Sequence, residues 1–217
     1  MVPLPFRNRQ EAGRALAEKL KIYAGKSSTL ILALVRGGVV IGRAIADTLS
    51  LPLYPYVVRK LGHPLQREFG LGALAEGGST YLDEETMRGH GVSWEDMEPV
   101  IEEETQELAR RKEAYLVRAR PDLKGKVIIL TDDGAATGVT LLAAIEDLRK
   151  AKVKKIVVAL PVCPPDTAKQ VEQRADEAVV LQTPTSFGAV GQWYSSFPQL
   201  TDTEVLALLK SSIGSLQ

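Results

Sequence analysis

Few residues in this sequence could build covalent cross-links or metal centres. It has one cysteine, Cys163, and two histidines, His63 and His90, in 217 residues. One cysteine excludes an internal disulfide framework and a zinc site made of several cysteines. Because Cys163 follows an apolar run and has no histidine near it in the sequence, we expect a buried structural thiol. Two histidines leave little for a histidine-rich metal centre or a Ser-His-Asp triad.

Long apolar runs and an excess of charge are also absent. The longest apolar runs, residues 30–35 and 156–162, are far too short to span a bilayer, so we expect no membrane partner. Residues 1–7 lack the apolar stretch of a signal peptide, and we therefore expect a cytoplasmic protein. Lysine and arginine together number 27, as do aspartate and glutamate, and this balance argues against a nucleic-acid partner.

The remaining composition is that of an ordinary globular domain. Apolar residues make up 45% and charged residues 25% of the chain, a mixture that disfavours disorder. The length suits one domain, and no linker or low-complexity tract divides the sequence. We therefore predict a single domain over residues 1–217.

Short apolar runs alternate along the chain with segments of helical periodicity. The runs predict strands over residues 29–35, 53–60, 69–75, 126–130, 155–162 and 177–181. The periodic segments predict helices over residues 8–20, 39–49, 140–150 and 166–174, and a final helix that begins near Thr201. Because the central strands are continuously apolar, the alternation predicts an α/β fold whose mainly parallel sheet has helices on both faces.

Three segments interrupt this alternation. Residues 61–68 are polar and contain glycine and proline, which predicts a loop. Ser93 and Asp96 form a capping-box pattern, and the periodicity that follows predicts one long amphipathic helix over about residues 93–118. Residues 184–200 contain glycine and aromatic residues without a period, and we expect irregular structure there.

The segment from Thr131 to Thr140 carries the clearest chemical signal. Two acids, Asp132 and Asp133, end a predicted strand, and a turn of small residues and threonines then opens a helix. Backbone N–H groups at a helix start bind anions, and small residues let a phosphate approach the backbone closely. The two carboxylates can accept hydrogen bonds from sugar hydroxyls or hold a divalent metal through water. The segment therefore predicts a site for a phosphate and a ribose.

This segment resembles the loop that binds phosphoribosyl pyrophosphate in type I phosphoribosyltransferases, with its two acids, short spacer and Thr-Gly-x-Thr. The chain is similar to bacterial phosphoribosyltransferase-like proteins with Val-Arg-Gly-Gly early and a long helix before the binding loop. The resemblance implies that fold, with a hood that includes about residues 184–200 and the long helix as an insertion. It gives catalytic roles to Asp132 and Asp133, which would bind Mg²⁺ through water or ribose hydroxyls. The 5-phosphate would be bound by Gly134, Ala135, Ala136, Thr137, Gly138, Val139 and Thr140.

Two further segments match the family. The loop Val35-Arg36-Gly37-Gly38 resembles the pyrophosphate loop, which implies that Arg36, Gly37 and Gly38 bind pyrophosphate. The resemblance places a non-proline cis peptide at Arg36–Gly37. Residues 59–69 resemble the mobile lid of the family, and its cations Arg59 and Lys60 would then act at the reacting centre.

The implied reaction moves ribose 5-phosphate from phosphoribosyl pyrophosphate to a nitrogenous base, with Mg²⁺ as the cofactor. Ala136 stands where 6-oxopurine enzymes of the family carry an aspartate, which argues against hypoxanthine or guanine as the acceptor. Glu68 of the lid is a candidate general base. Phe187, Tyr194 and Val162 are candidates for the acceptor pocket. The two aromatic residues are candidates because aromatic faces stack on flat bases.

Other functions of the same fold stay open. A non-catalytic regulator that senses phosphoribosyl pyrophosphate or a nucleotide is the alternative, although a zero net charge disfavours a basic face for nucleic acid. An enzyme that hydrolyses a sugar phosphate is a third. Homodimers are common in the family, so the resemblance also leaves a homodimer open.

Overall fold

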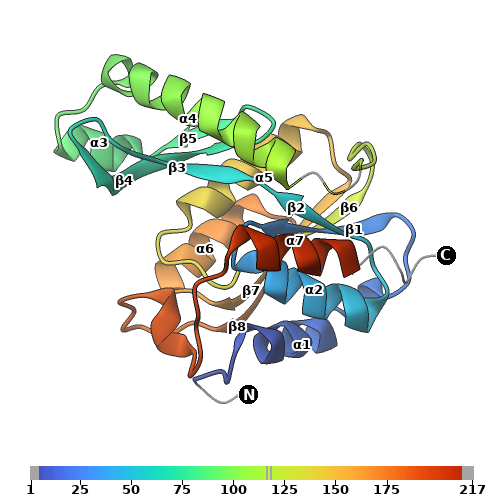
Figure 1. Ribbon diagram of the computed structural model, residues 1–217. Helices are drawn as coiled ribbons and strands as arrows, with labels where there is room; N and C mark the ends of the chain where they lie inside the picture. The colour runs from blue at the N-terminus through green and yellow to red at the C-terminus, as the bar shows by residue number, and fades with distance from the viewer. Residues whose placement is uncertain (1–4, 116, 118, 212–217) are drawn as a thin grey trace.

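The computed structural model describes residues 5–115, 117 and 119–211. Its centre is a parallel sheet in the order β2-β1-β6-β7-β8 (Figure 1). The strands are β1 (Thr29–Leu34), β2 (Leu53–Tyr56), β6 (Val127–Thr131), β7 (Lys155–Val162) and β8 (Glu177–Gln182). The predicted mainly parallel sheet is confirmed, and all six residues of β1 are buried, as expected of a strand covered on both faces.

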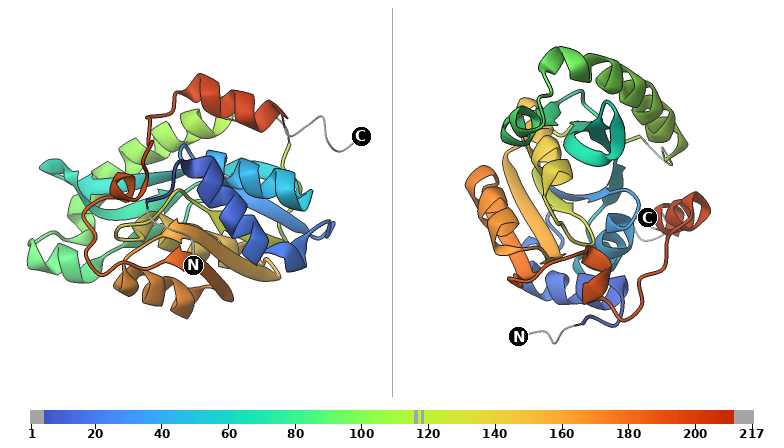
Figure 2. Two further views of the ribbon diagram at one scale, coloured as in Figure 1. Left: turned by 90° about the horizontal axis from the view of Figure 1, so that it is seen from below. Right: turned by 90° about the vertical axis from the view of Figure 1, so that its left-hand side faces the viewer.

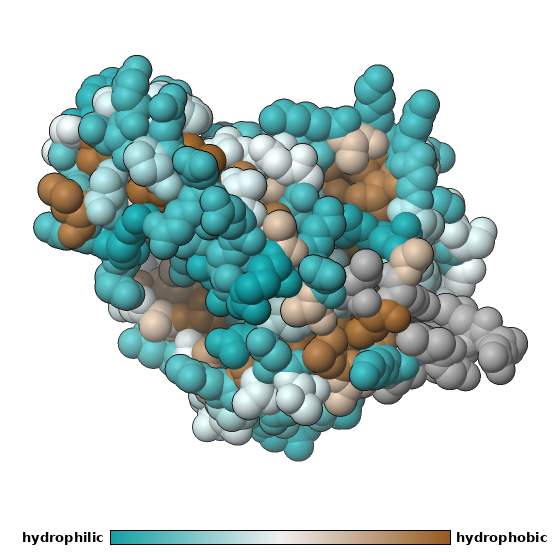
Figure 3. Space-filling model, turned by 45° about the horizontal axis from the view of Figure 1, so that its top comes forward, coloured by the Kyte–Doolittle hydropathy of each residue, from teal (hydrophilic) through white to brown (hydrophobic). Residues whose placement is uncertain are grey.

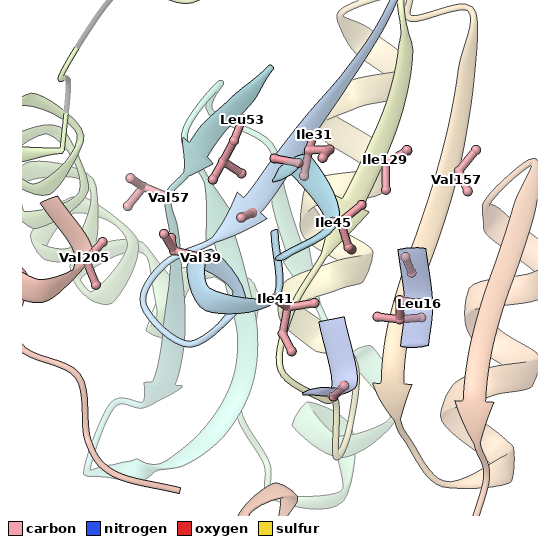
Figure 4. Close-up of a cluster of buried hydrophobic side chains, with 14 of the residues drawn as sticks. Leu16, Ile31, Val39, Ile41, Ile45, Leu53, Val57, Ile129, Val157 and Val205 are labelled. Carbon is pink, nitrogen blue, oxygen red and sulfur yellow. The ribbon is translucent and has the colours of Figure 1, made fainter. Parts of the chain in front are cut away.

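Helices cover the two faces of this sheet (Figure 2). One face carries α1 (Arg9–Lys19) and α2 (Gly38–Leu49), and α7 (Asp202–Ser211) packs outside α2. The other carries α5 (Val139–Lys150) and α6 (Pro165–Arg174). Side chains of β1 alternate between the faces: Ile31 packs with α2, and Leu32 packs with α5. Figure 4 shows the first of these two cores, whose buried side chains include Leu16, Ile31, Ile45, Ile129 and Val157.

A second, antiparallel sheet stands beside the first. It consists of β3 (Val58–His63), β4 (Gln66–Ala75) and β5 (Thr80–Leu82) in that order. The prediction of a loop over residues 61–68 is wrong, because β3 and β4 form a hairpin through this segment. Gly62 permits it, since any side chain at this position would collide with the carbonyl of Arg67 on the facing strand. The predicted strand over residues 53–60 is also two strands, one in each sheet.

Two helices follow the hairpin. They are α3 (Glu84–Gly89) and α4 (Trp94–Ala114), with short 3₁₀ turns elsewhere at η1 (Lys21–Tyr23) and η2 (Val190–Trp193). Both hydrogen bonds of the predicted capping box at Ser93 are present, so the start of the long helix is confirmed. The helix ends at Ala114, earlier than predicted, and residues 116 and 118 of the predicted span lie outside the described residues. Between residues 184 and 200, η2 is the one short helix, as the irregular composition predicted.

Ion pairs join α4 to the hairpin. Arg59 of β3 contacts Glu104 at 2.6 Å, and Arg67 of β4 contacts Glu103 at 2.7 Å. The outer surface of this part of the molecule is mainly hydrophilic (Figure 3). Among the described helices, none is both long and apolar enough to span a membrane.

Candidate functional site

A cavity of about 440 Å³ lies where β1 and β6 end. Ligands of open parallel sheets bind at such carboxyl ends of strands. The lining includes Arg36 after β1, Arg59 and Lys60 of β3, and every residue from Asp132 to Thr140. The structure therefore brings the predicted phosphate loop, acidic pair and cations into one cavity, although they are spread over almost half of the chain.

The segment that follows β6 is held by neighbouring backbone. The amide of Ala135 donates to the carbonyl of Val162 at 3.1 Å, and the Thr167 hydroxyl donates to the carbonyl of Ala136 at 2.6 Å. Gly138 immediately precedes α5 with φ 76°, where a side chain would meet Thr167. These contacts place the N-terminus of α5 at the cavity, where its free amides can bind a phosphate.

The two acids have different surroundings. Asp133 accepts a hydrogen bond from Nε of Arg9 at 2.7 Å, and Asp132 accepts one from the backbone amide of Asp133 at 2.9 Å. Burial raises the pKa of Asp132 well above its ordinary value, and the neighbouring charge of Asp133 raises it further. Burial also raises the pKa of Asp133, against the opposing charge of Arg9. The pair therefore lies in a setting that favours a compensating cation.

The Val35-Arg36-Gly37-Gly38 loop lies directly against this pair. A side chain on Gly37 would collide with the carboxylate of Asp133, and one on Gly38 would lie 2.8 Å from the carbonyl of Thr131. The prediction of a cis peptide at Arg36–Gly37 is wrong by one residue, because the cis bond joins Val35 to Arg36. Gly37 already has helical backbone angles as the cap of α2. The start of α2, like that of α5, thus reaches the acidic pair.

The cations of the cavity come from three elements. Lys60 is exposed, and its charge acts on Asp132, whereas Arg59 is held by Glu104. Arg36 lies 3.8 Å from Asp202 of α7. The prediction missed Arg111, which lines the cavity from α4. The basic run at residues 110–112 was the available signal, but the sequence does not show which member faces the site.

The predicted acceptor pocket needs correction. Val162 is 0% and Tyr194 6% exposed, so both side chains belong to the core and offer no face for a base. Tyr194 instead donates its hydroxyl to the carbonyl of Asp133 at 2.6 Å. Phe187 is half-buried and packs on Trp193, with ring centroids 5.8 Å apart. The residue of the predicted hood that lines the cavity is Val190.

Glu68 is not brought to the site either. It lies exposed on β4 and is not among the described residues that line the cavity. Within that lining, Asp132 and Asp133 are the sole carboxylates of the described residues, and no histidine accompanies them.

The donor set of the cavity fits a magnesium ion that arrives with a phosphorylated substrate. Within the described part of the chain, no group of three or more histidine, cysteine, aspartate or glutamate residues could hold a metal. Mg²⁺ usually keeps several waters and binds through one or two carboxylates together with substrate phosphates. Asp132 and Asp133 supply that number of carboxylates beside the candidate phosphate loop.

Comparison with known proteins agrees with this geometry. The family model of the phosphoribosyl transferase domain matches residues 6–194, which include the whole binding loop and the hairpin. The chain belongs to the phosphoribosyltransferase family. The fold implied by the sequence resemblance is thereby confirmed.

Relatives cover nearly all of the chain. Two provisionally named phosphoribosyl transferases, from two strains of Mycobacterium tuberculosis, are each 40% identical over 205 residues and match 94% of the chain. The match covers 46% of each relative, so the chain spans less than half of their length. The crystal structure of TT1426 from Thermus thermophilus is 36% identical with a TM-score of 0.80, and the match covers 96% of this chain and 99% of that one.

Proposed function

We propose that the cavity binds phosphoribosyl pyrophosphate and that the protein transfers its ribose 5-phosphate to a nitrogenous base. The observation that carries the proposal is the single cavity in which the phosphate loop, the acidic pair and the cations meet. The start of α5 would bind the 5-phosphate, and Asp132 would accept hydrogen bonds from the ribose hydroxyls. Arg36, Lys60 and Arg111 would bind the pyrophosphate as charged donors.

In this reaction the bond from the ribose C1 to the pyrophosphate oxygen breaks, a bond from C1 to a nitrogen of the base forms, and the proton carried by that nitrogen is released to solvent. The electron pair of the broken bond leaves with pyrophosphate, and positive charge develops at C1. This chain's residues would hold both ends of the donor in place and stabilise the charges that form. When bound, Mg²⁺ would neutralise part of the pyrophosphate charge, with Asp132 and Asp133 as its candidate carboxylates.

The structure also bears on the acceptor. Ala136 is exposed at the cavity, and its backbone carbonyl accepts a hydrogen bond from the Thr167 hydroxyl. Its side chain offers no carboxylate to a purine nitrogen. This supports an acceptor other than hypoxanthine or guanine. The hairpin and α4 cover the cavity through Lys60 and Arg111 and would limit the access of water to the reacting carbon.

Calorimetric titration with phosphoribosyl pyrophosphate and Mg²⁺ tests the first half of the proposal. We expect magnesium-dependent binding that the double variant Asp132→Asn/Asp133→Asn loses. A screen of nucleobases for pyrophosphate release tests the second half. No binding by the unaltered protein would overturn the proposal, and binding without turnover on any base would favour the regulator of the same fold.

A further inference from the structure

One buried arginine near the cavity has no role in the function proposed above. Arg9, the first residue of α1, is 7% exposed. Its Nε donates to Oδ2 of Asp133 at 2.7 Å, and its Nη1 donates to the carbonyl of Pro198 at 2.9 Å. The centre of its guanidinium lies 3.7 Å from the centroid of the Phe197 ring. A side chain held on three sides in this way acts on its neighbours and does not reach out to a ligand.

The same aspartate is held from other directions. Tyr194 donates to its backbone carbonyl at 2.6 Å, and the Tyr194 ring lies 5.1 Å from that of Phe197. Gly37 of the pyrophosphate loop leaves no room on the side of the carboxylate that faces α2. Asp133 is therefore enclosed by α1, the segment before α7, and the loop after β1.

Asp132 lacks a side-chain partner of this kind among the described residues. It accepts a hydrogen bond from the amide of Asp133, and in the described part of the chain no side chain donates a hydrogen bond to it. No ion pair with Asp132 is formed by the described residues, whereas Asp133 pairs with Arg9. Both acids line the cavity, but of the two Asp133 alone is paired with a side-chain cation in the described part of the chain.

We infer that Arg9 is a positioning residue that fixes Asp133 as the structural member of the acidic pair, which narrows the two candidate carboxylates for the metal and the ribose to Asp132. This inference rests on the proposed function. A carboxylate that loses its partner cation in a poorly solvated environment is left unpaired. Its side chain then rotates toward solvent or recruits water. The neighbouring backbone, on which the direction of Asp132 depends, then loses its support.

Calorimetric titration of Arg9→Met with phosphoribosyl pyrophosphate and Mg²⁺ tests the inference. Arg14→Ala is the matched control, because Arg14 is exposed on the same helix. All titrations are run well below the unfolding temperatures of the variants, so that every variant is folded. Under these conditions, replacing a residue that only stabilises the fold would leave the affinity unchanged. We expect Arg9→Met to weaken binding by tenfold or more and Arg14→Ala by less than twofold. The conservative Arg9→Lys keeps the charge but not both contacts, and we expect it to recover part of the affinity.

The two acids should then respond differently. We expect Asp132→Asn to abolish measurable binding and Asp133→Asn to weaken it by a factor close to that of Arg9→Met. The double variant Arg9→Met/Asp133→Asn should bind no more weakly than Asp133→Asn, because the pair is already broken. If Arg9→Met does not fold, Arg9→Lys provides the comparison.

Several results would overturn the inference. If Arg9→Met binds as tightly as the unaltered protein, Arg9 is only a packing residue. Where Arg9→Met does not fold, equal affinity in Arg9→Lys would lead to the same conclusion. A greater loss in Asp133→Asn than in Asp132→Asn would reverse the assignment of roles. Absence of binding by the unaltered protein would instead refute the proposed function, and the inference with it.

Discussion

At the scale of single residues, Asp132 lies where its charge is poorly solvated. Burial and the charge of Asp133 both raise its pKa. When a carboxyl has a higher pKa in the folded protein than in the unfolded chain, the folded state binds more protons between the two values. Stability therefore falls as pH rises through that window. Asp132, which would contact the ligand, thus lowers the stability of the free protein at neutral pH.

Asp132→Asn should remove this pH dependence. We expect the free energy of unfolding of the variant, relative to that of the unaltered protein, to increase as pH rises from about 4 to about 8. The gain is on the order of 1 kcal/mol for each unit by which folding raises the pKa. Urea unfolding across this range measures it, with Glu68→Gln as a control at an exposed carboxyl of β4. Parallel curves for Asp132→Asn and the unaltered protein would contradict the prediction.

At the scale of elements, α4 serves the cavity through one of its two adjacent arginines. Arg110 and Arg111 both pair with Glu107 at 2.7 Å, but Arg111 lines the cavity, whereas Arg110 is not among the described residues that line it. Variants at the two positions therefore distinguish a candidate ligand contact from a surface ion pair. Such an ion pair contributes about 0–1 kcal/mol to the free energy of unfolding.

We expect Arg111→Ala to weaken the binding of phosphoribosyl pyrophosphate by about 10- to 150-fold, because the loss of a hydrogen bond to a charged group costs about 1.5–3 kcal/mol. Arg110→Ala should leave the affinity unchanged. Calorimetric titration of both variants gives the comparison, and thermal unfolding should show similar small losses of stability. Equal affinities in the two variants would place Arg111 outside the binding site.

The elements also show what the sequence could predict. The binding loop was predicted because its signal is local: two acids, small residues and a helix start follow one another within a short segment. Arg9 could not be found in this way, because it meets Asp133 across 124 positions of the chain. The hairpin was missed because residues 66–70 are exposed and because the polar residues, glycine and proline of residues 61–68 resemble a loop. Its cross-strand contacts depend on a glycine whose role is visible in three dimensions alone.

At the scale of the whole molecule, the cavity joins the two layers of helices. The helix after β1 lies on one face of the sheet and the helix after β6 on the other, yet both begin beside the acidic pair. A ligand that reaches both helix starts would connect two separately packed cores. Hydrogen exchange should therefore report its binding on both faces of the sheet.

We expect phosphoribosyl pyrophosphate with Mg²⁺ to slow amide exchange in the first turns of both α2 and α5. Peptides from β8, at the edge of the sheet, provide the control and should exchange at an unchanged rate. Mass spectrometry of deuterium uptake with and without the ligand makes the measurement. Protection confined to α5 would show that the ligand occupies the phosphate loop without reaching Gly38.

The separation of the two sheets has a consequence for how such a protein can change its substrate. The segments that follow strands β1 and β6 would supply the proposed phosphate and ribose contacts, whereas the hairpin, α4 and η2 line the rest of the cavity. No strand pairing joins the hairpin sheet to the parallel sheet in the described part of the chain. Under the proposed function, binding of the sugar phosphate and choice of the acceptor would thus depend on separate parts of the chain, and the second part could be exchanged while the first stays intact.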